Sequence, residues 1–342
     1  MKKLKFKFII YILSFTILFL TLIFPQITVK VYAESGGKSE CVMELESRRI
    51  LYEKNGETRL PMASTTKIVT AITVLEHKKD LESVFEIPQN AVGVEGSSIY
   101  LKEGDKYSAI DLLYGLMLRS GNDAATALAI KTAGSIEKFS NLMNLTAQKA
   151  GALNSNFVNP HGLSAKNHYT TAKDLNYITC YALHNTLFQN IVSTRFYQPQ
   201  NWVNKNKLLK QYKYALGVKT GYTKEAGRCL VSAANKDDMT LVCTVLSCAD
   251  MYNRSIQLFE SCFSSYKREK IVDKNDVFTI SVNGKTREGK TNFDFYYPIL
   301  DEEREYIEIV TEENKGNSKE IIGQIKIFLL KRLIFSGNLY KL

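Results

Sequence analysis

Three short residue patterns occur in an order that suits nucleophilic catalysis by a serine. In chain order they are Ser64-x-x-Lys67, Ser120-x-Asn122 and Lys219-Thr220-Gly221. A serine hydroxyl is a poor nucleophile until a base takes its proton. A lysine can be that base only when it is neutral, and burial or a second nearby cation lowers the pKa of a lysine. The patterns therefore predict a serine nucleophile served by a lysine base.

The ordered set is more specific than its parts. Ser-x-x-Lys also begins at Ser35, Ser135 and Ser264, and Ser-x-Asn also begins at Ser336. Only the copy at Ser64 starts a long apolar run and precedes both other patterns. Taken singly, Ser64 is explained as a helix N-cap, residues 120–122 as a turn and residues 219–221 as a strand end. The combination favours a catalytic site.

With these patterns the chain resembles the penicillin-recognising serine acyl-enzymes, and among them the low-molecular-mass D-alanyl-D-alanine carboxypeptidases of bacterial cell walls. The resemblance is strong over residues 34–267. The segments that carry it are 51–55, 60–67, 112–116, 120–125, 159–163, 171–175 and 217–223. It implies an α/β (α+β) catalytic domain, in which helices flank an antiparallel sheet, followed by a small all-β domain.

The resemblance implies a catalytic role for three side chains. Ser64 is expected to form the acyl-enzyme, Lys67 to act as its base and Ser120 to relay a proton to the leaving amine. Ser64 at the start of a helix puts Lys67 one turn along the same face. The helix N-terminus also supplies a backbone N–H where an oxyanion develops.

Five further residues are expected to bind the substrate. By resemblance, Asn122 holds an amide of the substrate, while Lys219 and Thr220 meet its terminal carboxylate. Gly221 completes that pattern, and the backbone N–H of Tyr222 is the second oxyanion donor. Lys205 and Arg254 are further candidates for the carboxylate, although a surface-charge interpretation is favoured for both.

The function implied is removal of the terminal D-alanine from peptidoglycan stem pentapeptides, with β-lactams as covalent inhibitors and without a cofactor or metal. A DD-endopeptidase or transpeptidase shares the same patterns. A β-lactamase is disfavoured, because the middle pattern is Ser-Gly-Asn and the only nearby Glu-x-x-x-Asn, at Glu137, lies too close to it. A non-enzymatic peptidoglycan-binding scaffold is disfavoured because all three patterns are intact.

The elements that must position these residues are visible in the apolar patterning. Helices are predicted at 64–79, 109–118, 123–132, 136–150 and 252–266, and strands at 41–46, 50–53, 216–219, 228–234 and 239–247. The first helix is apolar nearly all round, which predicts a buried helix.

From about residue 270 to 342 the pattern of short strand-like runs and turn residues predicts a separate small β-rich domain. Strands are predicted at 276–282, 292–299, 305–310 and 321–328, with a polar loop at 310–319 and a hairpin turn at Asn283-Gly284. Residues 321–342 form two strand-like runs, so no anchoring amphipathic helix is expected there.

The N-terminus is expected to direct export. Lysines precede an apolar run at 8–24, and Val31-Tyr32-Ala33 offers small residues at a cleavage site. Residues 1–33 are thus predicted to be a signal peptide, with an uncleaved anchor as the alternative. The protein is then expected in the cell wall, secreted, or attached to the outer face of the membrane.

Charge and cysteine usage exclude other classes. The chain of 342 residues carries a net charge of +10, but half of that excess lies in the lysines of the first 33 residues. No basic stripe with interleaved aromatics remains, which argues against nucleic acid. The six cysteines have irregular spacing, so buried free thiols are favoured over disulfides, and the four histidines show no zinc-binding spacing.

Overall fold

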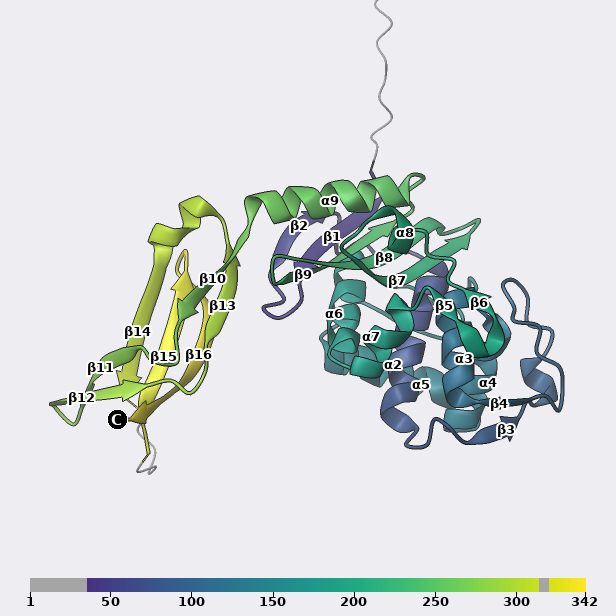
Figure 1. Ribbon diagram of the computed structural model, residues 1–342, viewed down its shortest axis with the longest axis horizontal. Coiled ribbons are helices and arrows are strands. Elements are labelled where there is room, and N and C mark those ends of the chain that lie inside the picture. Colours follow the sequence, from purple (N-terminus) through teal and green to yellow (C-terminus); the bar gives the residue numbers. More distant parts are fainter. Residues whose placement is uncertain (1–35, 314–319) are drawn as a thin grey trace, which may run out of the picture. The chain divides into compact units, whose positions relative to one another are not determined.

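The computed structural model describes residues 36–313 and 320–342 (Figure 1). The expected signal peptide at 1–33 lies outside these residues. A five-stranded antiparallel sheet has the order β2-β1-β9-β8-β7, which leaves β7 at one edge. Its strands are β1 (Ser39–Glu44), β2 (Ile50–Lys54), β7 (Ala215–Thr223), β8 (Gly227–Lys236) and β9 (Met239–Leu246).

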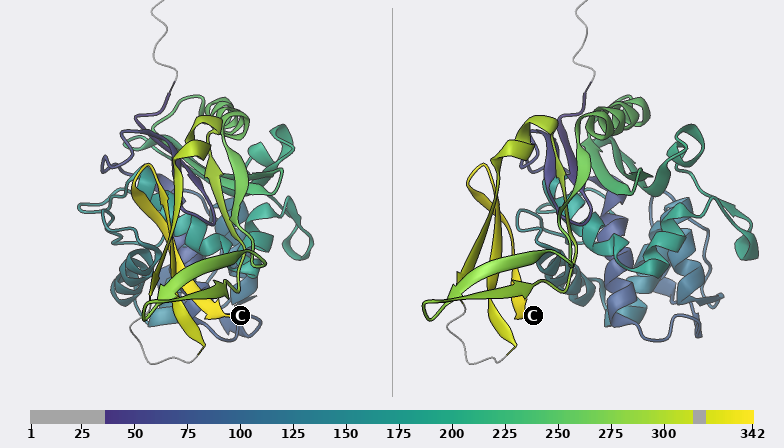
Figure 2. Two further views of the ribbon diagram at one scale, coloured as in Figure 1. Left: turned by 90° about the vertical axis from the view of Figure 1, so that its left-hand side faces the viewer. Right: turned by 60° about the vertical axis from the view of Figure 1, so that its left-hand side comes forward.

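Helices cover both faces of this sheet (Figures 1 and 2). One face packs against a large helical layer: α2 (Lys67–His77), α4 (Asn122–Ala133), α5 (Ile136–Ala150), α6 (Ala172–Leu183) and α7 (Thr186–Ser193). The other face packs against α9 (Met251–Ser265). Because both faces are buried, the central strands are apolar on both sides rather than alternating.

The helices that carry the patterns differ from their predicted form. The predicted helix at 64–79 begins as a 3-10 turn, η1 (Ala63–Thr66), continues as α2 and ends at His77. The predicted helix at 109–118 is α3 (Ala109–Tyr114) followed by a π-helical turn, η3 (Gly115–Arg119). Helices α6 and α7 were not predicted. Much of α6 is buried, so its apolar residues do not form a single stripe, and α7 has only eight residues.

Short elements complete this part of the chain. Two small hairpins pair β3 (Val84–Glu86) with β4 (Lys106–Ser108) and β5 (Phe196–Tyr197) with β6 (Trp202–Val203). The remaining turns are η2 (Gln89–Ala91), η4 (Gln198–Gln200) and α8 (Leu208–Gln211). All six cysteines lie in the described part of the chain, where they are free and buried.

The C-terminal part is a β structure with its own apolar core. A five-stranded sheet has the order β11-β12-β16-β15-β14, and β10 pairs with β13. The bounds are β10 (Lys267–Val272), β11 (Val277–Val282), β12 (Lys285–Lys290), β13 (Phe295–Ile299), η5 (Asp301–Tyr306), β14 (Ile307–Glu313), β15 (Ile321–Leu329) and β16 (Arg332–Lys341). The core includes Val272, Ile280, Ile325 and Leu339. A separate core supports the domain boundary near residue 270, which stays a prediction.

In this part of the chain, the end residues of the strands were predicted less well than the presence of the strands. The hairpin turn at Asn283-Gly284 is as expected, with both residues at positive φ between β11 and β12. The predicted strand at 305–310 begins inside η5, and β14 continues into the predicted loop as far as Glu313. Strands β10 and β12 were missed because charged residues interrupt them. No helix within the described ranges is long and apolar enough to cross a bilayer.

Candidate active site

The structure brings Ser64, Lys67 and Asn122 into direct contact. The Lys67 Nζ lies 2.9 Å from the Ser64 Oγ, and donates to the Asn122 Oδ1 at 2.6 Å and to the backbone oxygen of His161 at 2.7 Å. Lys67 is the first residue of α2, and helical side chains lean toward the N-terminus. The side chain therefore reaches back to the serine in η1.

Lys67 sits in surroundings that disfavour its charge. Its side chain is fully buried. Burial is the main cause that holds the pKa of Lys67 well below its usual range, and the nearby charges of Lys219 and Lys205 add to the effect, while Asp123 opposes it. These causes favour a neutral amine next to the serine hydroxyl.

Ser120 and Asn122 follow the π-helical turn. That turn ends at Ser120, whose φ of 66° is left-handed, and a new helix, α4, starts at Asn122. The Asn122 Nδ2 donates to the backbone oxygen of Glu95 at 2.5 Å. Since that oxygen can only accept, the Asn122 Oδ1 must face Lys67. The predicted role of Asn122 toward a substrate amide stays a prediction.

The third pattern lies on the edge strand β7. Lys219 is buried and donates to the backbone oxygen of Thr220 at 2.9 Å. Burial, followed by the charge of Lys205, lowers the pKa of Lys219 to about 7. Tyr222, by contrast, is 66% exposed.

Gly221 allows β7 to approach the serine turn closely. A Cβ built on Gly221 would lie 3.0 Å from the Ser64 backbone nitrogen and 3.0 Å from the Met62 oxygen. Both contacts are with backbone, so a side chain here would push the strand away from η1. The close approach brings the backbone of Gly221, the residue before Tyr222, beside that of Ser64.

One pocket of about 610 Å³ joins residues from all three patterns. Its lining includes Ser64, Ser120, Thr220 and Tyr222. Lys205, for which a surface-charge interpretation was favoured, is exposed and also lines this pocket. Within the described ranges, no group of histidines, cysteines and acids is arranged to hold a metal ion.

Arg254 is not part of this pocket. Its guanidinium donates to both carboxylate oxygens of Glu40, at 2.9 and 2.7 Å, and to the Tyr52 hydroxyl at 3.0 Å. Glu40 is fully buried, and the pair joins α9 to β1. Arg254 therefore has a structural partner rather than an open cationic end.

His161 was predicted to be a structural loop residue, and its ring fits that interpretation. The ring Nδ1 accepts from the backbone nitrogen of Leu163 at 3.2 Å. Burial, with a smaller effect from Lys67, lowers the pKa of His161 to about 3, so the ring is neutral at physiological pH. What sequence reasoning missed is the backbone oxygen of this residue, which receives a hydrogen bond from Lys67.

Asp123 is a second residue that was missed. Its carboxylate accepts from the Ser98 Oγ at 2.5 Å, from the Ile99 nitrogen at 3.1 Å and from the Leu101 nitrogen at 3.0 Å, and it is 1% exposed. It thus holds the preceding loop against the start of α4. The signal was present in the sequence as an acid directly after Ser-Gly-Asn.

Comparisons with known proteins agree with this site. The family described as D-alanyl-D-alanine carboxypeptidase matches residues 27–250. The carboxypeptidase DacF of Bacillus subtilis is 32% identical over 270 residues, which cover 75% of this chain and 69% of that protein.

Solved structures are also similar. Penicillin binding protein 5 from Haemophilus influenzae matches with a TM-score of 0.78 at 25% identity, covering 90% of this chain and 97% of that one. A DD-transpeptidase from Streptomyces matches with a TM-score of 0.63 at 32% identity, covering 67% of this chain and 98% of that one. The expected fold class is confirmed. The chain therefore belongs to the D-alanyl-D-alanine carboxypeptidase family, and it is a serine-type, low-molecular-mass penicillin-binding protein.

Proposed function

We propose that this carboxypeptidase removes the terminal D-alanine from peptidoglycan stem pentapeptides through an acyl-enzyme on Ser64. The observation that carries the proposal is the set of partners around the Lys67 amine. A neutral amine has two N–H groups and one lone pair. The Asn122 Oδ1 and the His161 backbone oxygen are acceptors only, so they take the two N–H groups. The lone pair is left for the Ser64 hydroxyl proton.

Acylation then follows from this arrangement. The Ser64 Oγ attacks the carbonyl carbon of the penultimate D-alanine while Lys67 takes its proton. Negative charge develops on the carbonyl oxygen. The backbone N–H groups of Ser64 and Tyr222 are the donors proposed to stabilise that charge, and the close approach of Gly221 to the Ser64 backbone supports this assignment.

Departure of the terminal residue needs a proton and a held carboxylate. Ser120 lines the pocket together with Ser64 and is suited to pass a proton to the leaving amine. Lys219 and Thr220 are suited to bind the terminal carboxylate, because a protonated lysine and a hydroxyl both donate hydrogen bonds. Water then hydrolyses the ester and releases Ser64.

The same chemistry accounts for covalent inhibition by β-lactams. Their cyclic amide opens on the serine, but the leaving nitrogen stays tethered to the acyl group. No product departs, so the ester lasts longer than the natural one. This outcome separates the enzyme from a β-lactamase, which hydrolyses the ester quickly.

The family's substrate lies outside the cytoplasm, so the protein acts there. We further propose export through the segment at 1–33, followed by location in the wall, in the medium or at the outer face of the membrane. A DD-transpeptidase or endopeptidase differs only in the nucleophile or peptide bond accepted, and the similarity to a solved transpeptidase keeps that alternative open.

The test is incubation with a pentapeptide that ends in D-alanyl-D-alanine, followed by enzymatic measurement of free D-alanine. We expect release by the wild type and none by Ser64→Ala. Ser264→Ala is the matched control, because Ser264 begins another Ser-x-x-Lys copy and is exposed. Fluorescent penicillin should label the wild type and the control stably. Label retained in Ser64→Ala would overturn the assignment, and rapid turnover of penicillin would favour a β-lactamase.

A further inference from the structure

The active-site pocket carries more positive charge than a single carboxylate requires. Lys205, Lys207 and Arg228 all line it, and no acidic side chain among the described residues does. None of the three takes part in an ion pair within the described part of the chain. All three are exposed, so they are available to a ligand.

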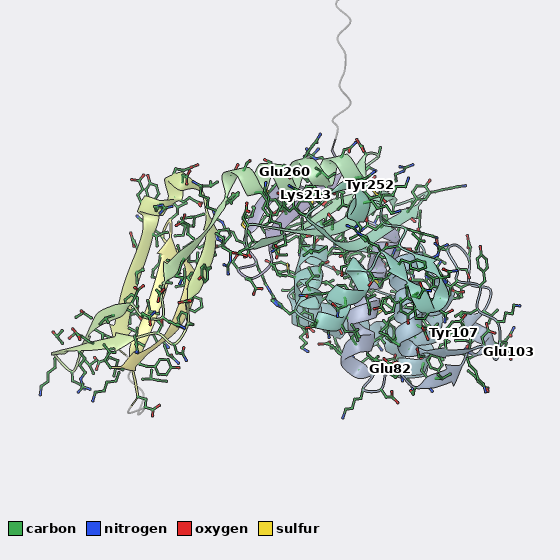
Figure 3. The ribbon with its side chains drawn as sticks, in the orientation of Figure 1. Glu82, Glu103, Tyr107, Lys213, Tyr252 and Glu260 are labelled. Atoms are coloured by element: carbon green, nitrogen blue, oxygen red, sulfur yellow. The ribbon has the colours of Figure 1, made fainter. Side chains whose placement is uncertain are left out.

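The three cations divide into two groups by position. Lys205 acts electrostatically on Lys219 and so belongs with the carboxylate site proposed above. Lys207 and Arg228 line the pocket together with Tyr252. Tyr252 lies at the N-terminal end of α9 (Figure 3). The backbone nitrogen of Lys207 donates to the Tyr252 hydroxyl at 3.4 Å, and the charge of Arg228 acts on that same hydroxyl.

The strand register sets the spacing of the second group. Arg228 on β8 pairs with Tyr222 on β7, two residues along from Thr220. Alternate residues share a face of a sheet, so Thr220, Tyr222 and Arg228 lie on one face. Two residues of strand span roughly 7 Å, and the neighbouring strand that carries Arg228 lies roughly 5 Å away. An anion at Arg228 is thus separated from a carboxylate at Thr220 by the length of a short side chain.

The pocket belongs to the leaving-group side of the reaction. Thr220, proposed to bind the terminal carboxylate, lines it, and so does Ser120, proposed to pass a proton to the leaving amine. We propose that Lys207, Arg228 and the Tyr252 hydroxyl form a second anion subsite, which favours a C-terminal D-residue with a carboxylate side chain. This inference rests on the proposed function. Hydrolysis is unchanged: the peptide C–N bond breaks, water is added and the free D-amino acid leaves.

The experiment compares three acylated tripeptides that differ only in the last residue. They end in D-alanyl-D-alanine, D-alanyl-D-glutamate and D-alanyl-D-lysine. We expect the wild type to cleave the D-glutamate peptide with a kcat/KM at least about tenfold above that of the D-lysine peptide, since hydrogen bonds to charged groups are strong. Arg228→Gln and Lys207→Gln should each reduce that ratio severalfold.

Lys210→Gln is the matched control. Lys210 is an exposed lysine on α8 that does not line the pocket, so its replacement removes the same charge elsewhere. The ratio should not change in this variant. Penicillin labelling of every variant checks that the serine site is intact.

Three results would overturn the inference. One is equal cleavage of the D-glutamate and D-lysine peptides by a wild type that cleaves D-alanyl-D-alanine. Another is a decrease of the D-glutamate to D-lysine ratio in Lys210→Gln as large as in Arg228→Gln, which would mean that the net charge of the protein attracts the peptide. A wild type that does not cleave D-alanyl-D-alanine would refute the proposed function itself, and this inference with it.

Discussion

Replacing Asp123 with asparagine should loosen the loop that forms one wall of the active site. The loop at 95–101 is attached to the start of α4 by the Asp123 carboxylate and by two bonds from Asn122, whose backbone nitrogen donates to the Ser97 oxygen at 2.7 Å. Asp123→Asn keeps the shape of the side chain. It turns one acceptor oxygen into an NH2 group that cannot accept.

The size of the effect follows from the contacts. The Asp123 Oδ2 accepts from the Ser98 hydroxyl and from the Leu101 nitrogen, so an NH2 group at that position leaves two donors without their acceptor. A hydrogen bond to a charged group contributes about 1.5–3 kcal/mol. The free energy of unfolding should fall by about 3–6 kcal/mol, and Tm by about 10 °C for a domain of this size.

The functional effect should be slower acylation. Ser97 lines the pocket, and small displacements of positioning groups reduce rates by about tenfold to a hundredfold. The assays are thermal unfolding and stopped-flow labelling with fluorescent penicillin. Asp80→Asn is the control: its carboxylate also accepts from backbone nitrogens, at Glu82 and Ser83, but on the surface. A decrease in the free energy of unfolding of less than about 1 kcal/mol in Asp123→Asn, the size expected for a surface change, would refute this prediction.

Three other outcomes are expected. Lys67→Met should keep its far-UV circular dichroism but lose penicillin labelling, because no base remains for Ser64; an unchanged acylation rate would exclude that role. Because Lys219 has a pKa of about 7, it is cationic below that pH and neutral above it, so KM for the pentapeptide should rise as pH increases through 7. A flat KM from pH 6 to 9 would contradict binding of the carboxylate by its charge. The six cysteines are buried, and burial raises the pKa of each thiol, so a maleimide should modify none in the native protein and six in urea; fewer than six in urea without reductant would indicate a disulfide.

The serine site could be predicted where the chemistry is encoded by local spacing. Lys67 lies three positions after Ser64, which is about one helical turn, and their contact follows from that spacing even though the turn is 3-10 rather than α. The order of the patterns then pointed to Lys219. These contacts can be predicted once the helices and strands are correctly identified, even if their end residues are not.

The supporting contacts could not be predicted in this way. The partners of Asp123 lie 22 to 25 residues before it in a loop that has no periodicity. Lys67 contacts a backbone oxygen, that of His161, 94 residues away, and a backbone atom leaves no trace in residue type. The structural role of Arg254 depends on its ion pair with the buried Glu40, which lies far from it in the sequence.

The position of β7 at the edge of its sheet has a consequence for what the enzyme leaves undigested. Within the described residues no strand pairs with the outer side of β7, and such an edge is open to strand addition. A peptide that lies beside Ser64 can use this edge only if its own backbone is extended and unpaired. Folded exported proteins have already satisfied their backbone groups internally. The edge strand therefore favours extended single chains, such as stem peptides, over the backbone of folded proteins.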